Sequence, residues 1–282
     1  MERRVVRRSN SSFVMPDGTR LFRRSWLPRQ PQRKLALVHG FAEHSGRYDH
    51  VGGWFAARDF AVHSYDHRGH GRSDGERGHV DSFSQLLDDL ESFLDQLRHE
   101  NPALPLVLMG HSLGGLLVAA LLVERKPDLL GAVLSAPPLE LGPGVSRLRL
   151  RLASTLRRFA PRLRLRAGID SRDLSRDPDV VRGYDDDPLV FKHATASFGA
   201  EALDAVARTG SAGMQVQVPL LMLHGEADRV CPSRGSRAFH GQLRGAGHRL
   251  RVYPMLRHEI LNEPEQEQVF EDVLAWVLER EA

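Results

Sequence analysis

Short apolar segments rich in β-branched residues alternate with longer segments of helical period along most of this chain. Parallel strands need long crossover connections, which helices supply, so this alternation is typical of a mostly parallel, twisted sheet with helices on both faces. A hairpin with the turn Pro16-Asp17-Gly18 precedes it. The expected core strands are 35–39, 61–65, 106–109, 131–135, 220–224 and 250–253, and the expected helices are 48–58, 83–98, 113–125, 233–243 and 264–278. The sequence therefore predicts an α/β fold class.

The alternation stops after residue 138 and resumes near residue 218, and no convincing strand lies between them. Residues 139–170 carry eight arginines against two acidic residues, whereas 171–205 carry eight acidic residues against four basic ones. The first half also predicts a basic amphipathic helix, because apolar residues recur at three- and four-residue spacing: Leu148, Leu152, Leu156, Phe159 and Leu163. We expect 1–138 and 218–282 to form the core, and 139–217 to form an inserted helical lid.

The composition excludes several classes of protein. With 41% hydrophobic and 27% charged residues, neither disorder nor a fibrous repeat is expected, and no apolar run approaches the roughly 18 to 20 residues of a membrane span. The single cysteine, Cys231, cannot form an internal disulfide, which fits a reducing compartment. The basic N-terminus has no apolar run behind it, so it is not a secretory signal. We expect a cytoplasmic protein.

The arginines are concentrated at the N-terminus and between residues 147 and 166. Neither cluster has the interleaved aromatic residues of a single-strand binding surface or the paired helices of a groove reader. We therefore expect no nucleic-acid partner.

The segment 106–115 reads as a strand that runs into Gly-His-Ser-Leu-Gly and then into a helix. A serine at such a sharp strand-to-helix turn has its hydroxyl exposed, and the helix N-terminus beside it favours developing negative charge. Ser112 is therefore the candidate nucleophile, and the backbone N–H of Leu113 is one candidate oxyanion donor. The second donor should come from the loop after the strand 35–39, where Phe41 stands.

A serine hydroxyl needs a general base, and that base needs an orienting acid. Asp228 lies in the loop after the strand 220–224 and is the candidate acid, with Glu226 as the rival. His258 follows the next strand and is the candidate base, whereas His240 and His248 precede or open that strand. The other histidines lack the HxHxDH and HExxH spacings of metal sites, so we expect no metal.

Six segments spread over nearly the whole chain carry recognisable motifs: HGFAEHSGRY (39–48), YDHRGHGRSDGERGHV (65–80), GHSLGG (110–115), DDPLV (186–190), HGEADRVC (224–231) and RHEILNE (257–263). Together they resemble the monoacylglycerol lipase and lysophospholipase-like branch of the α/β-hydrolases. The resemblance implies the α/β-hydrolase fold with Ser112, Asp228 and His258 as the catalytic triad, and it matches Phe41 and Leu113 to the oxyanion donors.

The resemblance further implies that Glu43 and Arg47 hold the polar glycerol end of the substrate. The two residues stand four apart, so an ion pair that steadies their loop explains them equally well.

The activity implied is that of a serine ester hydrolase that cleaves monoacylglycerols to fatty acid and glycerol without a metal or organic cofactor. A lysophospholipase or general carboxylesterase is the alternative, and a non-catalytic binding protein of this fold is a remote one, because such proteins commonly lack a triad member. The family's lid docks on membranes. An arginine-rich amphipathic helix can lie on an anionic bilayer, which would place the protein at the membrane periphery, but it can equally be a solvated lid face.

Overall fold

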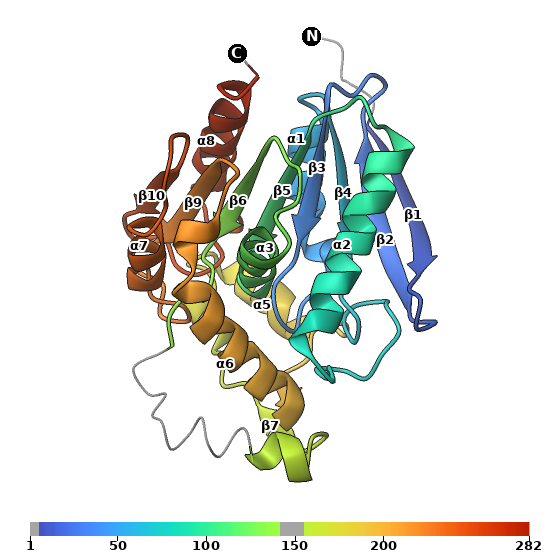
Figure 1. Cartoon of the computed structure of the whole chain (residues 1–282), viewed down its shortest axis with the longest axis vertical. Helices are drawn as coiled ribbons and strands as arrows, with labels where there is room; N and C mark the ends of the chain where they lie inside the picture. Colours follow the sequence, from blue (N-terminus) through green and yellow to red (C-terminus); the bar gives the residue numbers. More distant parts are fainter. Residues whose placement is uncertain (1–5, 142–154, 282) are drawn as a thin grey trace.

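The computed structural model describes residues 6–141 and 155–281, and its centre is one eight-stranded sheet (Figure 1). The strands lie in the order β1-β2-β4-β3-β5-β6-β9-β10. Their bounds are β1 Arg7–Val14, β2 Arg20–Leu27, β3 Arg33–Val38, β4 Phe60–Tyr65, β5 Leu106–His111, β6 Gly131–Ser135, β9 Leu220–Gly225 and β10 Arg249–Tyr253. β2 is antiparallel to β1 and to β4. The remaining neighbours in this sheet, from β4 through β3, β5, β6 and β9 to β10, pair parallel. The predicted hairpin and all six predicted core strands are therefore confirmed.

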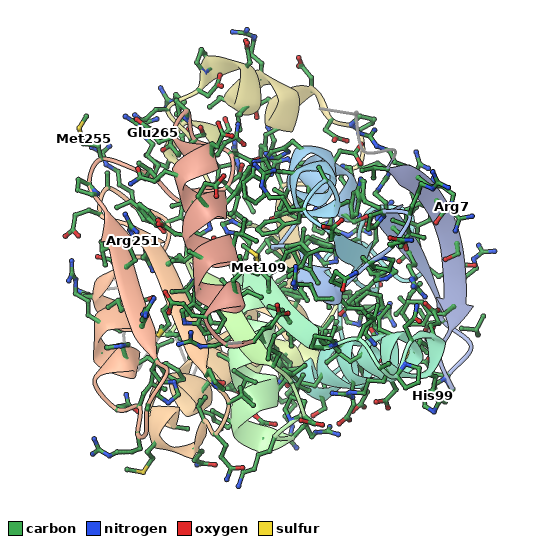
Figure 2. All side chains as sticks on the ribbon, turned by 90° about the horizontal axis from the view of Figure 1, so that it is seen from above. Arg7, His99, Met109, Arg251, Met255 and Glu265 are labelled. Carbon is green, nitrogen blue, oxygen red and sulfur yellow. The ribbon has the colours of Figure 1, made fainter. Side chains whose placement is uncertain are left out.

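Helices cover both faces of the sheet, as Figure 2 shows from above. α1 (Asp49–Ala56) and α8 (Gln266–Leu278) pack on one face, and α2 (Phe83–Glu100) and α3 (Leu113–Glu124) pack on the other. α7 spans Arg234–His240. Strands β3, β4, β5, β6 and β9 are buried over almost their whole length, as expected for parallel strands that are covered on both sides.

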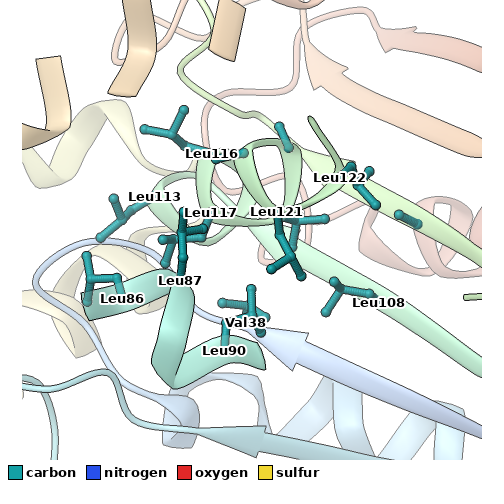
Figure 3. Packing of buried hydrophobic residues seen from close by; sticks show 14 of the residues in the cluster. Val38, Leu86, Leu87, Leu90, Leu108, Leu113, Leu116, Leu117, Leu121 and Leu122 are labelled. Atoms are coloured by element: carbon teal, nitrogen blue, oxygen red, sulfur yellow. The ribbon is translucent and has the colours of Figure 1, made fainter. Parts of the chain in front are cut away.

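The central helix α3 is apolar all round its circumference and is buried from Leu113 to Val123. Its leucines pack against Leu86, Leu87 and Leu90 of α2 and against β3 and β5 (Figure 3). A helix without a polar face can be stable only inside the protein. The position of its first residue is therefore tightly fixed, and Ser112 stands directly before it.

Residues 139–217, which we call the inserted segment, contain α5 (Pro178–Asp186) and α6 (Ala196–Gly210). α6 buries Phe198, Ala205 and Val206 in the same core cluster as α2 and α3, so this part of the inserted segment is continuous with the core.

The expectation of no strand in the inserted segment is wrong. β7 (Arg164–Arg166) and β8 (His193–Thr195) form a short antiparallel pair. Strands of three residues are too short for an alternating pattern to be recognised in the sequence.

Most of the expected basic amphipathic helix falls on residues 142–154, outside the described residues. Residues 155–159 are helical, but the helix ends there and does not reach Leu163, because Pro161 disfavours helical backbone at the residue before it. Within 6–141 and 155–281, no helix combines the length and hydropathy required to span a bilayer.

Candidate active site

Ser112 lies at a strained turn between β5 and α3, with φ 52° and ψ −118°. Two glycines allow the backbone to come this close. A Cβ on Gly110 would lie 2.3 Å from the carbonyl oxygen of Gly114, and a Cβ on Gly114 would lie 2.2 Å from the carbonyl oxygen of Val38. Any other residue at either position would push α3 away from the ends of β3 and β5. The Gly-x-Ser-x-Gly pattern is therefore a packing requirement at this turn.

Ser112, His258 and Asp228 are joined by a continuous chain of hydrogen bonds, although they are far apart in the sequence. The Ser112 hydroxyl donates to Nε2 of His258 over 2.9 Å, and Nδ1 of His258 donates to Oδ2 of Asp228 over 2.8 Å. His258 and Asp228 are 3% and 6% exposed, whereas Ser112 is half-buried. The geometry therefore allows a proton to pass from the hydroxyl to the imidazole.

Asp228 is held by the loop that carries it. Its Oδ1 accepts the backbone N–H groups of Val230 and Cys231, both at 2.8 Å, and its Oδ2 also accepts from Nε2 of His224 at 3.1 Å. Burial disfavours the charged carboxylate, but the charge of His258 and these hydrogen bonds outweigh it and hold the pKa of Asp228 well below its ordinary value. The carboxylate therefore remains ionised.

The pKa of His258 is shifted in the opposite direction. Burial alone would lower it, but the negative charge of Asp228 and the hydrogen bond to it raise the pKa above its ordinary value. His258 is therefore a stronger base than an exposed histidine.

Phe41 lies in the loop after β3, close to Ser112. A Cβ on the preceding Gly40 would lie only 3.2 Å from Cβ of Ser112. The backbone N–H of Phe41 has no hydrogen-bond partner among the described residues, and that of Leu113 opens α3, where no helical carbonyl can accept it. Both sequence-predicted donors are thus free to bind an oxygen beside Ser112.

Glu43 and Arg47 belong to a buried ionic cluster with Glu259. Nη1 of Arg47 donates to both carboxylates, at 2.7 Å to Glu43 and 2.6 Å to Glu259, and Nη2 donates to Glu259 at 2.9 Å. Oε1 of Glu43 accepts the N–H of Gly40 and the hydroxyl of Tyr48, both at 2.6 Å. Glu43 holds Gly40 in the loop of Phe41, and Glu259 directly follows His258. The guanidinium of Arg47 therefore links the loop of Phe41 to the loop of His258.

The two carboxylates of this cluster differ in acidity. Burial, together with the nearby charge of Glu259, raises the pKa of Glu43. Burial acts on Glu259 in the same direction, but its bidentate contact with Arg47 is stronger and lowers its pKa to about 2.

Sequence reasoning missed Glu259 and His224, although both stand inside the segments on which the resemblance rests.

The inserted segment contacts the loop that carries Phe41 and the loop that carries His258. Nε2 of His44 lies 2.8 Å from Oδ2 of Asp187, and the N–H of Glu259 donates to the carbonyl of Leu174. The Phe41 ring packs against Phe191 and Phe198, with centroids 5.5 and 4.9 Å away.

His39, His67 and His70 lie together beside the ends of β3 and β4, with ring centroids 4.1 to 5.7 Å apart. Nε2 of His39 accepts the N–H of His67, and Nε2 of His67 lies 2.9 Å from the carbonyl of His39, so these contacts join the two strand ends. Burial lowers the pKa of His67 to about 4 and that of His70 to about 3, so both are neutral. In the described part of the chain, no three side chains of His, Cys, Asp or Glu are arranged to hold a metal ion.

Comparisons with known proteins identify the family of this chain. Residues 29–265 match the Hydrolase_4 family, described as serine aminopeptidase S33. The chain is 36% identical to a monoacylglycerol lipase of Mycolicibacterium smegmatis, over 96% of this chain and 97% of that protein. It is 35% identical to the human monoglyceride lipase, over 96% of this chain and 90% of that protein.

The crystal structure of the Paleococcus ferrophilus monoacylglycerol lipase is similar along nearly the whole chain. Its TM-score is 0.82 at 30% identity, and the match covers 98% of this chain and 99% of that one. The chain therefore belongs to the Hydrolase_4 family, serine aminopeptidase S33, and is an α/β-hydrolase homologous to the monoacylglycerol lipases.

Proposed function

We propose that this protein hydrolyses monoacylglycerols to a fatty acid and glycerol through an acyl-enzyme on Ser112. The observation that carries the proposal is the hydrogen-bond chain from the Ser112 hydroxyl through His258 to an ionised Asp228. The substrate class comes from the relatives, which are named monoacylglycerol or monoglyceride lipases and align along nearly the whole chain.

In the proposed mechanism, Nε2 of His258 takes the proton of the Ser112 hydroxyl as the oxygen attacks the ester carbonyl. The N–H groups of Phe41 and Leu113 bind the oxyanion, and Asp228 stabilises the imidazolium. His258 then gives the proton to the glycerol oxygen, and glycerol leaves. A water molecule, deprotonated by the same imidazole, attacks the acyl-enzyme. The imidazolium then returns this proton to Oγ of Ser112 as the acyl–oxygen bond breaks and the fatty acid is released. No step needs a metal or an organic cofactor.

We further propose that Glu43 and Arg47 position the two loops rather than hold the glycerol. Their side chains are 3% and 9% exposed. Both oxygens of Glu43 already accept hydrogen bonds, and both Nη atoms of Arg47 donate to carboxylates. A glycerol hydroxyl would have to displace one of these buried contacts, which would leave a charge poorly satisfied.

The inserted segment, 139–217, is proposed to act as a lid on the core of 1–138 and 218–282. Its contacts with the loops of Phe41 and His258 support this role. Its outer surface carries exposed apolar side chains among arginines, with Phe159 78%, Leu163 45% and Leu165 46% exposed. Such a surface can rest on an anionic bilayer, so we propose peripheral membrane contact here.

Replacing Ser112 with Ala is expected to abolish hydrolysis of monoacylglycerols and labelling by a fluorophosphonate, while the melting temperature stays near that of the wild type. The preferred substrate is identified with the wild type. Its hydrolysis rates are compared on monoacylglycerols, on lysophosphatidylcholine and on aryl esters of graded chain length. Appreciable turnover by the alanine variant contradicts the nucleophile assignment. A clear preference for lysophosphatidylcholine or for short aryl esters contradicts the substrate.

The pH dependence of kcat/KM tests the role of His258. Only the neutral imidazole can accept the serine proton, so activity should be level at alkaline pH. It should fall about tenfold per pH unit below an apparent pKa that lies above 6.5. Asp228→Asn removes the charge that raises this pKa, so the acid limb should move to lower pH and kcat/KM should drop by about 10³- to 10⁴-fold. Activity that increases on acidification would exclude this base.

Glu43→Gln tests the positioning role, because it keeps the size of the side chain and removes its charge. We expect kcat to fall about tenfold or more on a monoacylglycerol and equally on a glycerol-free ester of the same acyl chain, with KM little changed. A rise in KM confined to the glycerol ester would instead assign Glu43 to the glycerol.

Membrane contact is tested by sedimentation with anionic vesicles at low salt. We expect the wild type to bind and Phe159→Ser to bind about tenfold more weakly, because the exposed aromatic ring that would be buried in the bilayer on binding is lost. Val14→Ser, which changes an exposed apolar side chain on β1, outside the inserted segment, should bind like the wild type. Equal binding of both variants, or no binding at low salt, overturns the membrane proposal.

A further inference from the structure

A hollow of about 540 Å³ lies at the opposite end of the sheet from Ser112. It is bounded by β1, β2 and β4 and by the C-terminal end of α2, where Leu97, Glu100 and Asn101 line it. Lys34 and Ala61, at the amino ends of β3 and β4, also line it, whereas Ser112 follows the carboxyl end of β5. The hollow is thus separate from the catalytic machinery.

The sheet face inside this hollow is polar, although the same face is apolar elsewhere. Ser9 pairs with Ser25 across β1 and β2, and Ser25 pairs with His63 across β2 and β4. Along the same face of β1 and β2, towards the other end, Phe13 pairs with Leu21 and both lie in the main core. Ser25 and His63 are nevertheless 95% buried. Burying a hydroxyl and an imidazole is costly unless hydrogen bonds satisfy their polar atoms, so the partners of each atom decide what this face can bind.

The protonation of His63 follows from its neighbours. Nδ1 of His63 accepts from Nη2 of Arg23 at 2.9 Å and lies 2.8 Å from the Ser25 hydroxyl. Burial and the charge of Arg23 lower the pKa of His63 to about 3, so the ring is neutral and its proton is on Nε2. No described residue accepts that N–H, and His63 lines the hollow. The imidazole therefore offers one free donor.

The charges around the hollow are predominantly positive. The lining includes Arg7, Arg23, Arg29 and Lys34 against one acidic residue, Glu100, which is paired with Arg23. Lys34 donates to the carbonyls of Leu97 and Asn101. Arg7 and Arg29 are exposed and form no ion pair with any residue in 6–141 or 155–281.

Apolar side chains complete the lining: Leu27, Pro28, Pro31, Ala61 and Leu97. A ligand that uses the whole hollow therefore combines an anionic head with a short apolar part. A free inorganic ion would leave this apolar surface uncovered, and a neutral lipid would leave the arginines unpaired.

We propose that this hollow is a non-catalytic binding site for a small amphiphilic anion with a carboxylate head. The head binds Arg7 and Arg29 at the mouth and accepts the free N–H of His63, with the Ser9 hydroxyl as a further donor. The apolar part packs between Leu27 and Leu97. A carboxylate is planar and matches the paired N–H groups of an arginine, which favours this head group.

Two neighbouring arginines on β1 make a matched test. Successive side chains of a strand point to opposite faces. Arg7 lines the hollow, whereas Arg8 approaches Asp49 instead, at 3.7 Å. Arg7→Ala and Arg8→Ala therefore remove the same charge from the same strand, and both side chains are exposed, so both variants should fold.

The experiment titrates octanoate into the wild type (residues 1–282) and both variants by calorimetry, with inorganic phosphate and 1-octanol as separate arms. We expect Arg7→Ala to weaken octanoate binding about tenfold and Arg8→Ala to change it less than about twofold. Phosphate and octanol should each bind the wild type more weakly than octanoate. Phosphate can pair only with the cationic groups of the lining, and octanol can cover only its apolar side chains.

The ring resonances of His63 provide a second measurement that does not depend on affinity. Octanoate should shift them in the wild type and in Arg8→Ala at equal occupancy. Octanoate bound only at the catalytic site would leave His63 unmoved and would bind both variants equally. Either result overturns the proposal, as does binding of phosphate as tight as that of octanoate.

Discussion

The close approach of the α3 N-terminus to the ends of β3 and β5 is the constraint on which the rest of the active site depends. Gly114 has no room for a Cβ beside the carbonyl oxygen of Val38, and Gly110 has none beside Gly114. This contact forces Ser112 into its strained backbone conformation. It also brings the first free amide of α3 and the loop after β3 to the same point. Strain at Ser112 costs about 1–3 kcal/mol, and the fully buried α3 stabilises the surroundings that maintain it.

A second constraint fixes the positions of the two loops around Ser112 relative to each other. The loops of Phe41 and His258 come from strands that are not adjacent in the sheet, so no ladder of backbone hydrogen bonds joins them. Arg47 makes that connection through Glu43 and Glu259. A buried cluster of this kind stabilises the fold little, because desolvation offsets the attraction between the charges. Its value is geometric, since it aligns the candidate oxyanion donor with the candidate base.

Part of the site could be predicted because strand-end loops have recognisable residues. Ser112, Asp228 and His258 each follow a predicted strand, and the carboxyl ends of parallel strands meet at one edge of a sheet. The supporting residues could not be found in this way. His224 is the second-last residue of β9 and Glu259 is one of several acidic residues near the chain end, and nothing in their spacing distinguishes them from surface residues. The strands β7 and β8 were missed for a similar reason, since three residues contain too little periodicity.

The sequence by itself determined the α/β class, the order of the elements and the family, because periodicity and short motifs are local properties of the chain. It also indicated which serine, acid and histidine to consider. Only the tertiary structure decided which groups share protons and charges: Asp228 with His224 as well as with His258, and Arg47 with two carboxylates that are 216 positions apart. It alone placed Ser9, Ser25 and His63 in one row across three strands. Burial and strand pairing set these relations, and both depend on how distant segments pack.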